Sequence, residues 1–441
     1  MVEPRPAVTT VGFVDDYCNH YQDLFADVRN FEAFKFLHIG MISEMPRKSL
    51  PAIAKSVGLA NAQSLHHFLQ RTPWQVEQFR AKRLDLIKQL VGKRSIILCI
   101  DETGDKKAGK TTDYVAKQYI GNLGKTDNGI VSVNAYAIVD NITYPLLFKI
   151  FKPRLRLQPD DVYKNKPQLA VEILQELEEW KFQIELVLAD SLYGESGDVI
   201  CELQRLKLPF IVAIRSNHGV LVAPGQKVRY NRWRAYVQPL SHRPDETRYI
   251  REIIFGKARS IRYYEISKTD NPTTNPLETW FIMTNLPKSW QLQLGKRYSL
   301  RGWIEYGFKQ VKNELGWADF RVTDYTSIER WWEIVLSAYL LISWHANDFC
   351  TQAQTRHTQS TSTSTSKIPF ESHQRWEAGT NWKSALNNLR LLIQPFIFWC
   401  LLQAWLQVFP IPGLKRSFFK LIAYINGFRA SSITNAQLNS A

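Results

Sequence analysis

The sequence is short of cysteine and of acidic residues, and both shortages limit what the protein can be. Its five cysteines stand at positions 18, 99, 201, 350 and 400, far apart and without a CxxC pair. Reduced thiols in a cytosolic protein explain this spacing better than disulfides or a zinc site. Asp and Glu number 41 against 56 Lys and Arg, which leaves a formal net charge of +15. Such an excess of positive charge predicts a polyanion or an anionic membrane surface as the partner.

The sequence also lacks an N-terminal basic segment followed by an apolar core, so no signal peptide is expected. One apolar run, residues 389–409, is long enough to suggest a transmembrane helix, which needs about 20 mostly apolar residues. It contains Pro395 and three glutamines, Gln394, Gln403 and Gln407, whose amides are unfavourable in lipid. We therefore predict a buried helix pair of a soluble protein, with a membrane segment as the weaker alternative.

The 441 residues are 45% hydrophobic and 22% charged, which indicates a globular chain of roughly two to four domains. Hydrophobic periodicity predicts helices first, then a mixed α/β core interrupted by a β-rich insertion, and helices again at the end. The expected segments are 1–92 (helical), 93–216 (α/β core, first part), 217–297 (β-rich insertion), 298–350 (core helices), 351–368 (Ser/Thr-rich loop) and 369–441 (helical).

Within the first segment, helices are expected at residues 49–56 and 62–70, joined by a turn at Val57-Gly58-Leu59. Helix, short glycine-containing turn and helix is the shape of a helix-turn-helix DNA reader, although any three-helix bundle contains such a turn. Three nearby cations are candidate DNA contacts: Arg47, Lys48 and Lys55.

Two acids stand where buried strands end. Asp101 closes the apolar run "RSIILCID", and Asp190 follows the apolar residues of "IELVLADSLYGE". In α/β folds, ligands bind at the carboxyl ends of strands. The alternative is that each acid only caps a turn.

A third acid lies in "RYSLRGWIEYGFKQVKNELG", residues 297–316, which is expected to be one helix. At about 100° per residue, one stripe is apolar, and a second stripe beside it holds Tyr298, Arg301, Glu305 and Lys312. This second stripe is either a phosphate- or metal-binding face or a solvated row of ion pairs.

Asp101, Asp190 and Glu305 can converge on one point, where three carboxylates would bind Mg²⁺ or Mn²⁺ through oxygen. Two such ions suit phosphodiester chemistry. Arg301 and Lys312 would then hold phosphates.

The spacing Y-x2-R-x3-E-x6-K resembles the signature around the third acid of DDE transposases of the insertion sequence 4 superfamily. Three further segments resemble the insertion sequence 701 group within it: "IDETGDKKAGK" with "VAKQYIGNLGKTDNGIVSVNAYA" around the first acid, "LADSLYGE" around the second, and "KSLPAIAKSVGLANAQSLHHFLQRTPW" near the N-terminus. The similarity covers roughly residues 30 to 345.

This resemblance implies a ribonuclease-H-like catalytic core with a β-rich insertion, flanked by helical regions, and cut-and-paste transposition. It implies that Asp101, Asp190 and Glu305 are catalytic and hold two Mg²⁺ (Mn²⁺ can substitute), with Tyr298, Arg301 and Lys312 on the DNA. The expected partners are double-stranded DNA, as terminal inverted repeats and target, and a second copy of the chain on that DNA. The expected location is the bacterial cytoplasm at the nucleoid, without a membrane.

One rival interpretation uses "GDKKAGKT", residues 104–111, which fits the phosphate loop of P-loop ATPases. Against it, Asp101, Glu102 and Thr103 stand between the strand and the first glycine, and no helical pattern follows. In the transposase interpretation, three lysines form a basic loop on the DNA backbone: Lys106, Lys107 and Lys110. A second rival is a sequence-specific DNA-binding protein without catalysis.

Overall fold

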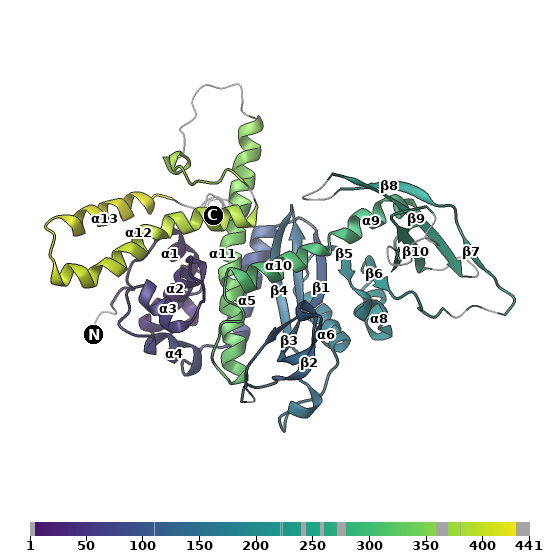
Figure 1. Cartoon of the computed structure of the whole chain (residues 1–441), viewed down its shortest axis with the longest axis horizontal. Helices are drawn as coiled ribbons and strands as arrows, with labels where there is room; N and C mark the ends of the chain where they lie inside the picture. The colour runs from purple at the N-terminus through teal and green to yellow at the C-terminus, as the bar shows by residue number, and fades with distance from the viewer. Residues whose placement is uncertain are drawn as a thin grey trace.

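The computed structural model describes residues 5–109, 111–220, 222, 224–239, 244–255, 260–270, 279–358, 369–379 and 381–428. Three parts follow one another across the molecule: a group of N-terminal helices, a central sheet and a β-rich arm at the far edge of that sheet (Figure 1). The chain is thus mixed α/β, as the sequence predicts.

The N-terminal helices are α1 (Gly12–Asn19), α2 (Val28–Ile42), α3 (Leu50–Ser56), α4 (Gln63–Gln70) and α5 (Val76–Val91). Ser49 caps α3 by accepting a hydrogen bond from the amide of Ala52. Gly58 ends it with φ of +76°, while the amide of Leu59 bonds back to the carbonyl of Ala54 at 2.9 Å. The predicted helix pair is therefore present within a residue of its expected bounds.

Five strands form the centre of the sheet, in the spatial order β4 (Ile142–Ile150), β3 (Lys125–Val139), β1 (Ile96–Lys106), β5 (Ile184–Ala189) and β6 (Phe210–Ile214). β3 pairs antiparallel with both β4 and β1, whereas β5 and β6 run parallel to β1. Residues 130–139 of β3 are all buried, so both faces of the sheet are covered. β2 (Ala116–Ile120) pairs with the start of β3.

The arm continues the same sheet. β11 (Thr279–Thr284) pairs antiparallel with β6, and β10 (Arg262–Ser267), β9 (Glu246–Phe255), β8 (Arg234–Gln238) and β7 (Val228–Tyr230) follow outward, with β7 and β8 both on β9. The β-rich segment expected at 217–297 therefore holds these five strands, together with most of α9 (Gln291–Ser299). Helices α6 (Lys166–Glu179), α7 (Ser191–Gly194) and α8 (Gly197–Arg205) connect the core strands.

The prediction of a single helix at 297–316 is wrong, because the chain forms two helices there, the end of α9 and then α10 (Gly302–Asn313). Between them the amides of Arg301 and Ile304 bond to the carbonyls three residues earlier, at 3.0 and 3.1 Å. This tighter turn separates Tyr298 from Glu305 into two helices. The apolar stripe is buried as predicted, with Ile304, Val311 and Leu315 at most 1% exposed.

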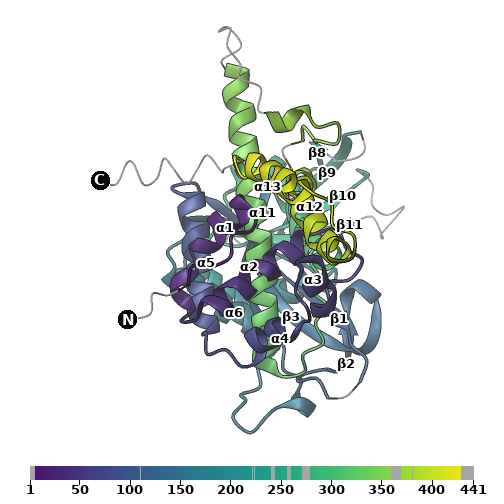
Figure 2. The same cartoon turned by 90° about the vertical axis from the view of Figure 1, so that its left-hand side faces the viewer.

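The long helix α11 (Tyr325–Thr358) contacts α5 and α2 on the N-terminal side and β4 in the sheet, and its last turns extend past the other N-terminal helices (Figure 2). The Ser/Thr-rich loop expected at 351–368 therefore begins as helix, while 359–368 lie outside the described residues.

The buried helix pair expected at 389–409 is also wrong. Residues 382–408 form one helix, α12 (Trp382–Val408), followed by α13 (Leu414–Ile425). Helix α12 packs on α11, α2 and α3, and most of its buried residues lie between Trp382 and Ile393, but Trp405 and Val408 are each 65% exposed. By length and composition alone α12 could cross a membrane, and only 17% of its most apolar window is buried.

Candidate active site

Asp101 and Asp190 lie side by side because of the register of two parallel strands. Ile100 of β1 is paired with Ala189 of β5, so the next residue in each segment is one of the two acids. Asp190 directly follows β5, as predicted. The strand-end position predicted for Asp101 is wrong, because β1 stays paired with β3 as far as Lys106 after its pairing with β5 has ended. Asp101 is only 8% exposed. Asp190 also caps α7, accepting a hydrogen bond from the amide of Leu192 at 2.9 Å. The capping role and the strand-end position are therefore combined in one residue.

Arg301 joins the first aspartate to the helical glutamate. Its Nη1 donates to Oδ2 of Asp101, and its Nη2 donates to Oε1 of Glu305, both at 2.7 Å. Because Glu305 is one turn further along α10, the guanidinium spans both carboxylates from a single position. Asp101 thus meets the Arg301–Glu305 part of the predicted stripe.

The electrostatics of this centre reflect one buried acid, Asp101, beside the half-buried Asp190, whereas Glu305 is exposed. Burial raises the pKa of Asp101 to about 7; the charge of Asp190 adds to this rise, and the guanidinium of Arg301 opposes it. Burial likewise raises the pKa of the Tyr298 phenol to about 12, and its hydroxyl lies 3.5 Å from the carbonyl oxygen of Ala189, next to Asp190. The site therefore favours added positive charge.

Carboxylate oxygens are the ligands that Mg²⁺ prefers, so the donor set fits a hard divalent cation. In the described part of the chain, however, no three His, Cys, Asp or Glu side chains are grouped closely enough to hold an ion. The guanidinium of Arg301 lies between Asp101 and Glu305 and supplies the cationic charge there.

Lys312 lies on the same helix as Glu305 but contacts the end of β1. Its ammonium is 3.0 Å from Oδ1 of the buried Asp105 and donates to the carbonyl of Gly104 at 2.7 Å. Lys312 thus fixes α10 against β1. Sequence analysis missed Asp105, because its partner is 207 positions away and only the fold brings the two together.

A second residue that sequence analysis missed is Glu102, directly after Asp101. It accepts a hydrogen bond from Lys166, at the start of α6, at 2.8 Å and one from the hydroxyl of Tyr193 at 3.4 Å. Glu102 thereby ties β1 to α6 and α7 beside the acidic centre. The sequence indicates Glu102 only through its position directly after Asp101.

The basic loop expected at Lys106, Lys107 and Lys110 is only partly available for DNA. Lys106 is exposed and paired with Asp127 at 2.9 Å. Lys107 donates to the carbonyl of Ala318 at 2.7 Å and lies 3.3 Å from the centre of the Phe320 ring; burial lowers its pKa to about 8. Lys110 lies outside the described residues.

The P-loop interpretation is wrong. Strand β1 runs through Gly104 to Lys106, so the glycine is inside a strand and not in a turn. None of the described residues between Lys107 and Val115 is helical, although a phosphate loop must lead into a helix.

Of the cations expected on the helix pair, Arg47 and Lys55 are exposed. Lys48 is a correction: it is 3% exposed, its amide donates to Asp319 at 2.7 Å, and its ammonium donates to the carbonyl of Ser43. We therefore exclude Lys48 from the candidate DNA contacts. Burial lowers its pKa to about 7.

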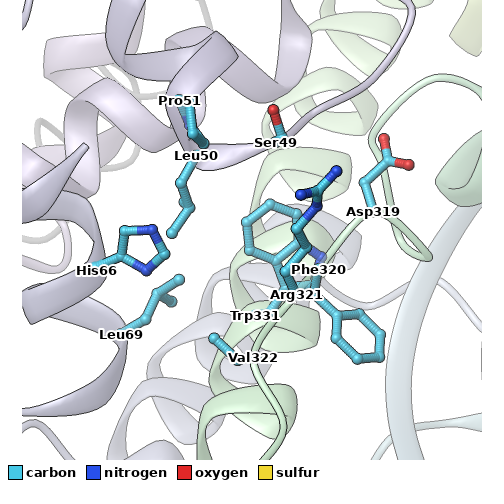
Figure 3. A pocket seen from close by; sticks show the side chains of 10 residues that line it. All are labelled: Ser49, Leu50, Pro51, His66, Leu69, Asp319, Phe320, Arg321, Val322 and Trp331. Atoms are coloured by element: carbon cyan, nitrogen blue, oxygen red, sulfur yellow. The ribbon is translucent and has the colours of Figure 1, made fainter. Parts of the chain in front are cut away.

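A cavity of about 420 Å³ lies between the helix pair and the residues that follow α10. Leu50, Leu69 and Val322 give it an apolar lining, and His66 and Arg321 approach it from opposite sides (Figure 3). The cavity is formed by the N-terminal helices and by residues just beyond the third-acid helix, so it marks where these two parts of the chain meet.

Two aspartates on neighbouring parallel strands, with an arginine that joins the first of them to a glutamate on a helix, are typical of nucleases that act on phosphodiesters with acidic residues. Comparison with known proteins agrees. The family described as DDE superfamily endonuclease matches residues 21–252, which include Asp101 and Asp190. A "Probable transposase for insertion sequence element IS701" from Microchaete diplosiphon is 54% identical over 330 residues, covering 75% of this chain and 87% of that protein.

The chain therefore belongs to the DDE superfamily endonucleases and is a DDE-type transposase of the insertion sequence 701 kind. The resemblance noted in the sequence is confirmed. The interpretation as a DNA-binding protein without catalysis is wrong.

Proposed function

We propose that this transposase cuts and joins the ends of its own insertion sequence by a cut-and-paste route. The observation that carries the proposal is the meeting of Asp101, Asp190, Arg301 and Glu305 where the parallel pairing of β1 with β5 ends. The strand order β4-β3-β1-β5-β6, with two parallel strands after three antiparallel ones, supports a ribonuclease-H-like core.

Asp101, Asp190 and Glu305 are the proposed ligands of two Mg²⁺ ions, for which Mn²⁺ can substitute. Such ions, when bound, supply an activated water and stabilise the leaving oxygen of a phosphodiester. The two nitrogens of Arg301 now occupy one oxygen of Asp101 and one of Glu305, so Arg301 would compete with a metal ion for these oxygens. Arg301 then exchanges carboxylate oxygens for phosphate oxygens, which are equally good acceptors for a guanidinium.

Tyr298 and Lys312 complete the signature with different roles. The phenol of Tyr298, beside Arg301 and Asp190, stays protonated at neutral pH and can donate to a phosphate near the cut. Lys312 is bound to Asp105 and Gly104, so it holds α10 in place in the DNA-free protein. It joins Arg301 on DNA only if it leaves Asp105.

The proposed partners are double-stranded DNA, at the terminal inverted repeats and at the target, and a second copy of the chain, because two ends must be cut together. Arg47 and Lys55 on the helix pair and Lys106 at the end of β1 are the exposed candidates for backbone contacts. The proposed location is the bacterial cytoplasm at the nucleoid, without membrane attachment.

Strand transfer tests this function directly. A labelled duplex that ends at the terminal repeat is incubated with the protein, Mg²⁺ and a supercoiled target plasmid. Wild-type protein should join the label to the plasmid, and Asp190→Asn should not. The proposal would be overturned if folded wild-type protein, given a duplex with the terminal repeat of its own element, failed to join the label to the plasmid.

A further inference from the structure

The outer edge of the β-rich arm is unusually basic. Residues 203–244 contain no Asp or Glu, and four cations fall within eight positions: Lys227, Arg229, Arg232 and Arg234. All four are exposed. Among the described residues, Lys227, Arg232 and Arg234 have no carboxylate partner. A row of unneutralised cations attracts a polyanion.

These cations are held on a fixed scaffold. β7 and β8 both pair with β9 and form the last edge of the sheet. Between them Asn231 keeps the chain in place with two bonds of 2.9 Å, from its amide to the carbonyl of Glu252 and from Nδ2 to Oε2 of Glu252. Arg232 follows this anchor directly, so it projects from a short, pinned bend.

Two aromatic rings at the same edge, those of Tyr230 and Trp233, lie against Arg251. The guanidinium of Arg251 lies 4.6 Å from the ring centre of Tyr230 and 4.4 Å from that of Trp233, and it is itself held by Glu265 at 2.6 Å. Tyr230 nevertheless remains 58% exposed. A half-exposed aromatic ring close in the chain to Arg232 and Arg234 is a typical surface for a sugar-phosphate backbone.

The sheet itself gives the distance from this edge to the acids. Five strand spacings separate β5, which ends at Asp190, from β7; at about 4.8 Å each they amount to roughly 24 Å. A DNA duplex covers that distance in about 7 base pairs at 3.4 Å each. The helix pair α3–α4 lies on the opposite side of the central sheet (Figure 1).

We infer that this edge, comprising Lys227, Arg229, Tyr230, Arg232 and Arg234, binds the backbone of the duplex flanking the transposon, about 7 base pairs beyond the cut. The inference rests on the proposed function, in which the helix pair holds the transposon end and the acids face the cut. DNA that crosses the acids from the helix pair then continues toward the arm. The edge would bind the flanking donor DNA, which does not move with the transposon, and would release it after cleavage.

The test compares two duplexes, one ending at the cut and one carrying 20 base pairs of flank, by titration at several salt concentrations in Ca²⁺. Arg232→Ala with Arg234→Ala should bind the flanked duplex about tenfold more weakly per lost phosphate contact at 0.1 M salt, and lower its salt slope by about 0.9 per contact. Binding to the duplex without flank should stay at the wild-type level.

Two controls define the result. Lys88→Ala with Lys93→Ala removes the same charge from exposed positions on and just after α5 and should leave both affinities unchanged, and Arg232→Lys with Arg234→Lys should restore most of the lost affinity. Equal losses on both duplexes, or none, would overturn the inference. So would a change of oligomeric state without a change in DNA affinity, since the edge would then serve a protein partner. Wild-type protein that binds neither duplex would instead overturn the proposed function, and the inference with it.

Discussion

The guanidinium of Arg301 donates to Asp101 and to Glu305 at the same distance, 2.7 Å. One arginine thus pairs with two acids, Asp101 of β1 and Glu305 of the signature, while the protein is free of DNA. The acidic centre is in this way stable before substrate arrives, although Asp101 is buried. The consequence is competition between Arg301 and any cation that approaches the same oxygens.

Replacing Arg301 should therefore have opposite effects on metal and on DNA. In Arg301→Met, Asp101 and Glu305 lose their internal counter-ion, so Mn²⁺ should bind roughly tenfold more tightly, or about 1.4 kcal/mol. Binding to the terminal repeat should weaken. Isothermal titration with Mn²⁺ and a gel shift in Ca²⁺ measure the two effects, and weaker Mn²⁺ binding by the variant would contradict this account of Arg301.

The pair Lys312–Asp105 should contribute to stability. Lys312→Ala leaves Asp105 charged and buried, which typically lowers the free energy of unfolding by about 3–5 kcal/mol. Adding Asp105→Asn should recover part of this loss, because the uncompensated charge is removed. Urea unfolding of both single variants and the double variant gives the coupling, and additive losses would show that the two side chains act independently.

Lys48 should make stability depend on pH. Its folded pKa, about 7, is below the usual 10.4 of a lysine, so the unfolded chain binds the extra proton between these values. The contribution is therefore fully favourable above about pH 10 and is lost as pH falls toward 7. Lys48→Met removes this dependence, so the variant should gain stability relative to wild type as the pH is lowered from 10 to 7.

Melting curves across that range measure the difference. Lys48→Met should also bind terminal DNA as wild type does, since the side chain is buried. If the difference in melting temperature between Lys48→Met and wild type did not change with pH, the ammonium would be in water, and Lys48 would again be a candidate DNA contact.

Unlike the buried Lys48, the exposed cations Arg47 and Lys55 should contribute to DNA binding. Arg47→Ala with Lys55→Ala should weaken binding to the terminal repeat and flatten the plot of log affinity against log salt by about 0.9 for each lost phosphate contact. The Lys88→Ala with Lys93→Ala protein is the charge-matched control. An unchanged slope would move the DNA-binding surface away from α3 and α4.

Local pattern was enough to find the parts of this site. Buried apolar runs locate β1 and β5, and the acid after each run follows from the sequence alone. The helix pair was predictable because Ser49 marks the start of its first helix and Gly58 marks the turn that follows it. In each case the determining residues are neighbours in the chain.

What the sequence could not reveal depends on contacts between distant residues. Lys48 is buried because Asp319, 271 positions away, accepts its amide, so a lysine beside a DNA-binding motif became a structural residue. The break between α9 and α10 arises from two tightened backbone bonds at Arg301 and Ile304, which side-chain periodicity does not record. The exposure of Trp405 similarly depends on where α11 and the N-terminal helices end.

Cleavage by isosteric variants of the acids tests the central claim most directly. Asp101→Asn, Asp190→Asn and Glu305→Gln each remove one charge with little change in size. A labelled duplex carrying the terminal repeat and its flank is incubated in Mg²⁺ with each variant, with a gel shift in Ca²⁺ and a melting curve alongside. The account predicts that all three variants bind DNA, keep a melting temperature near or above that of wild type because carboxylate repulsion falls, and fail to cut. Cutting by Glu305→Gln at the wild-type rate would contradict it.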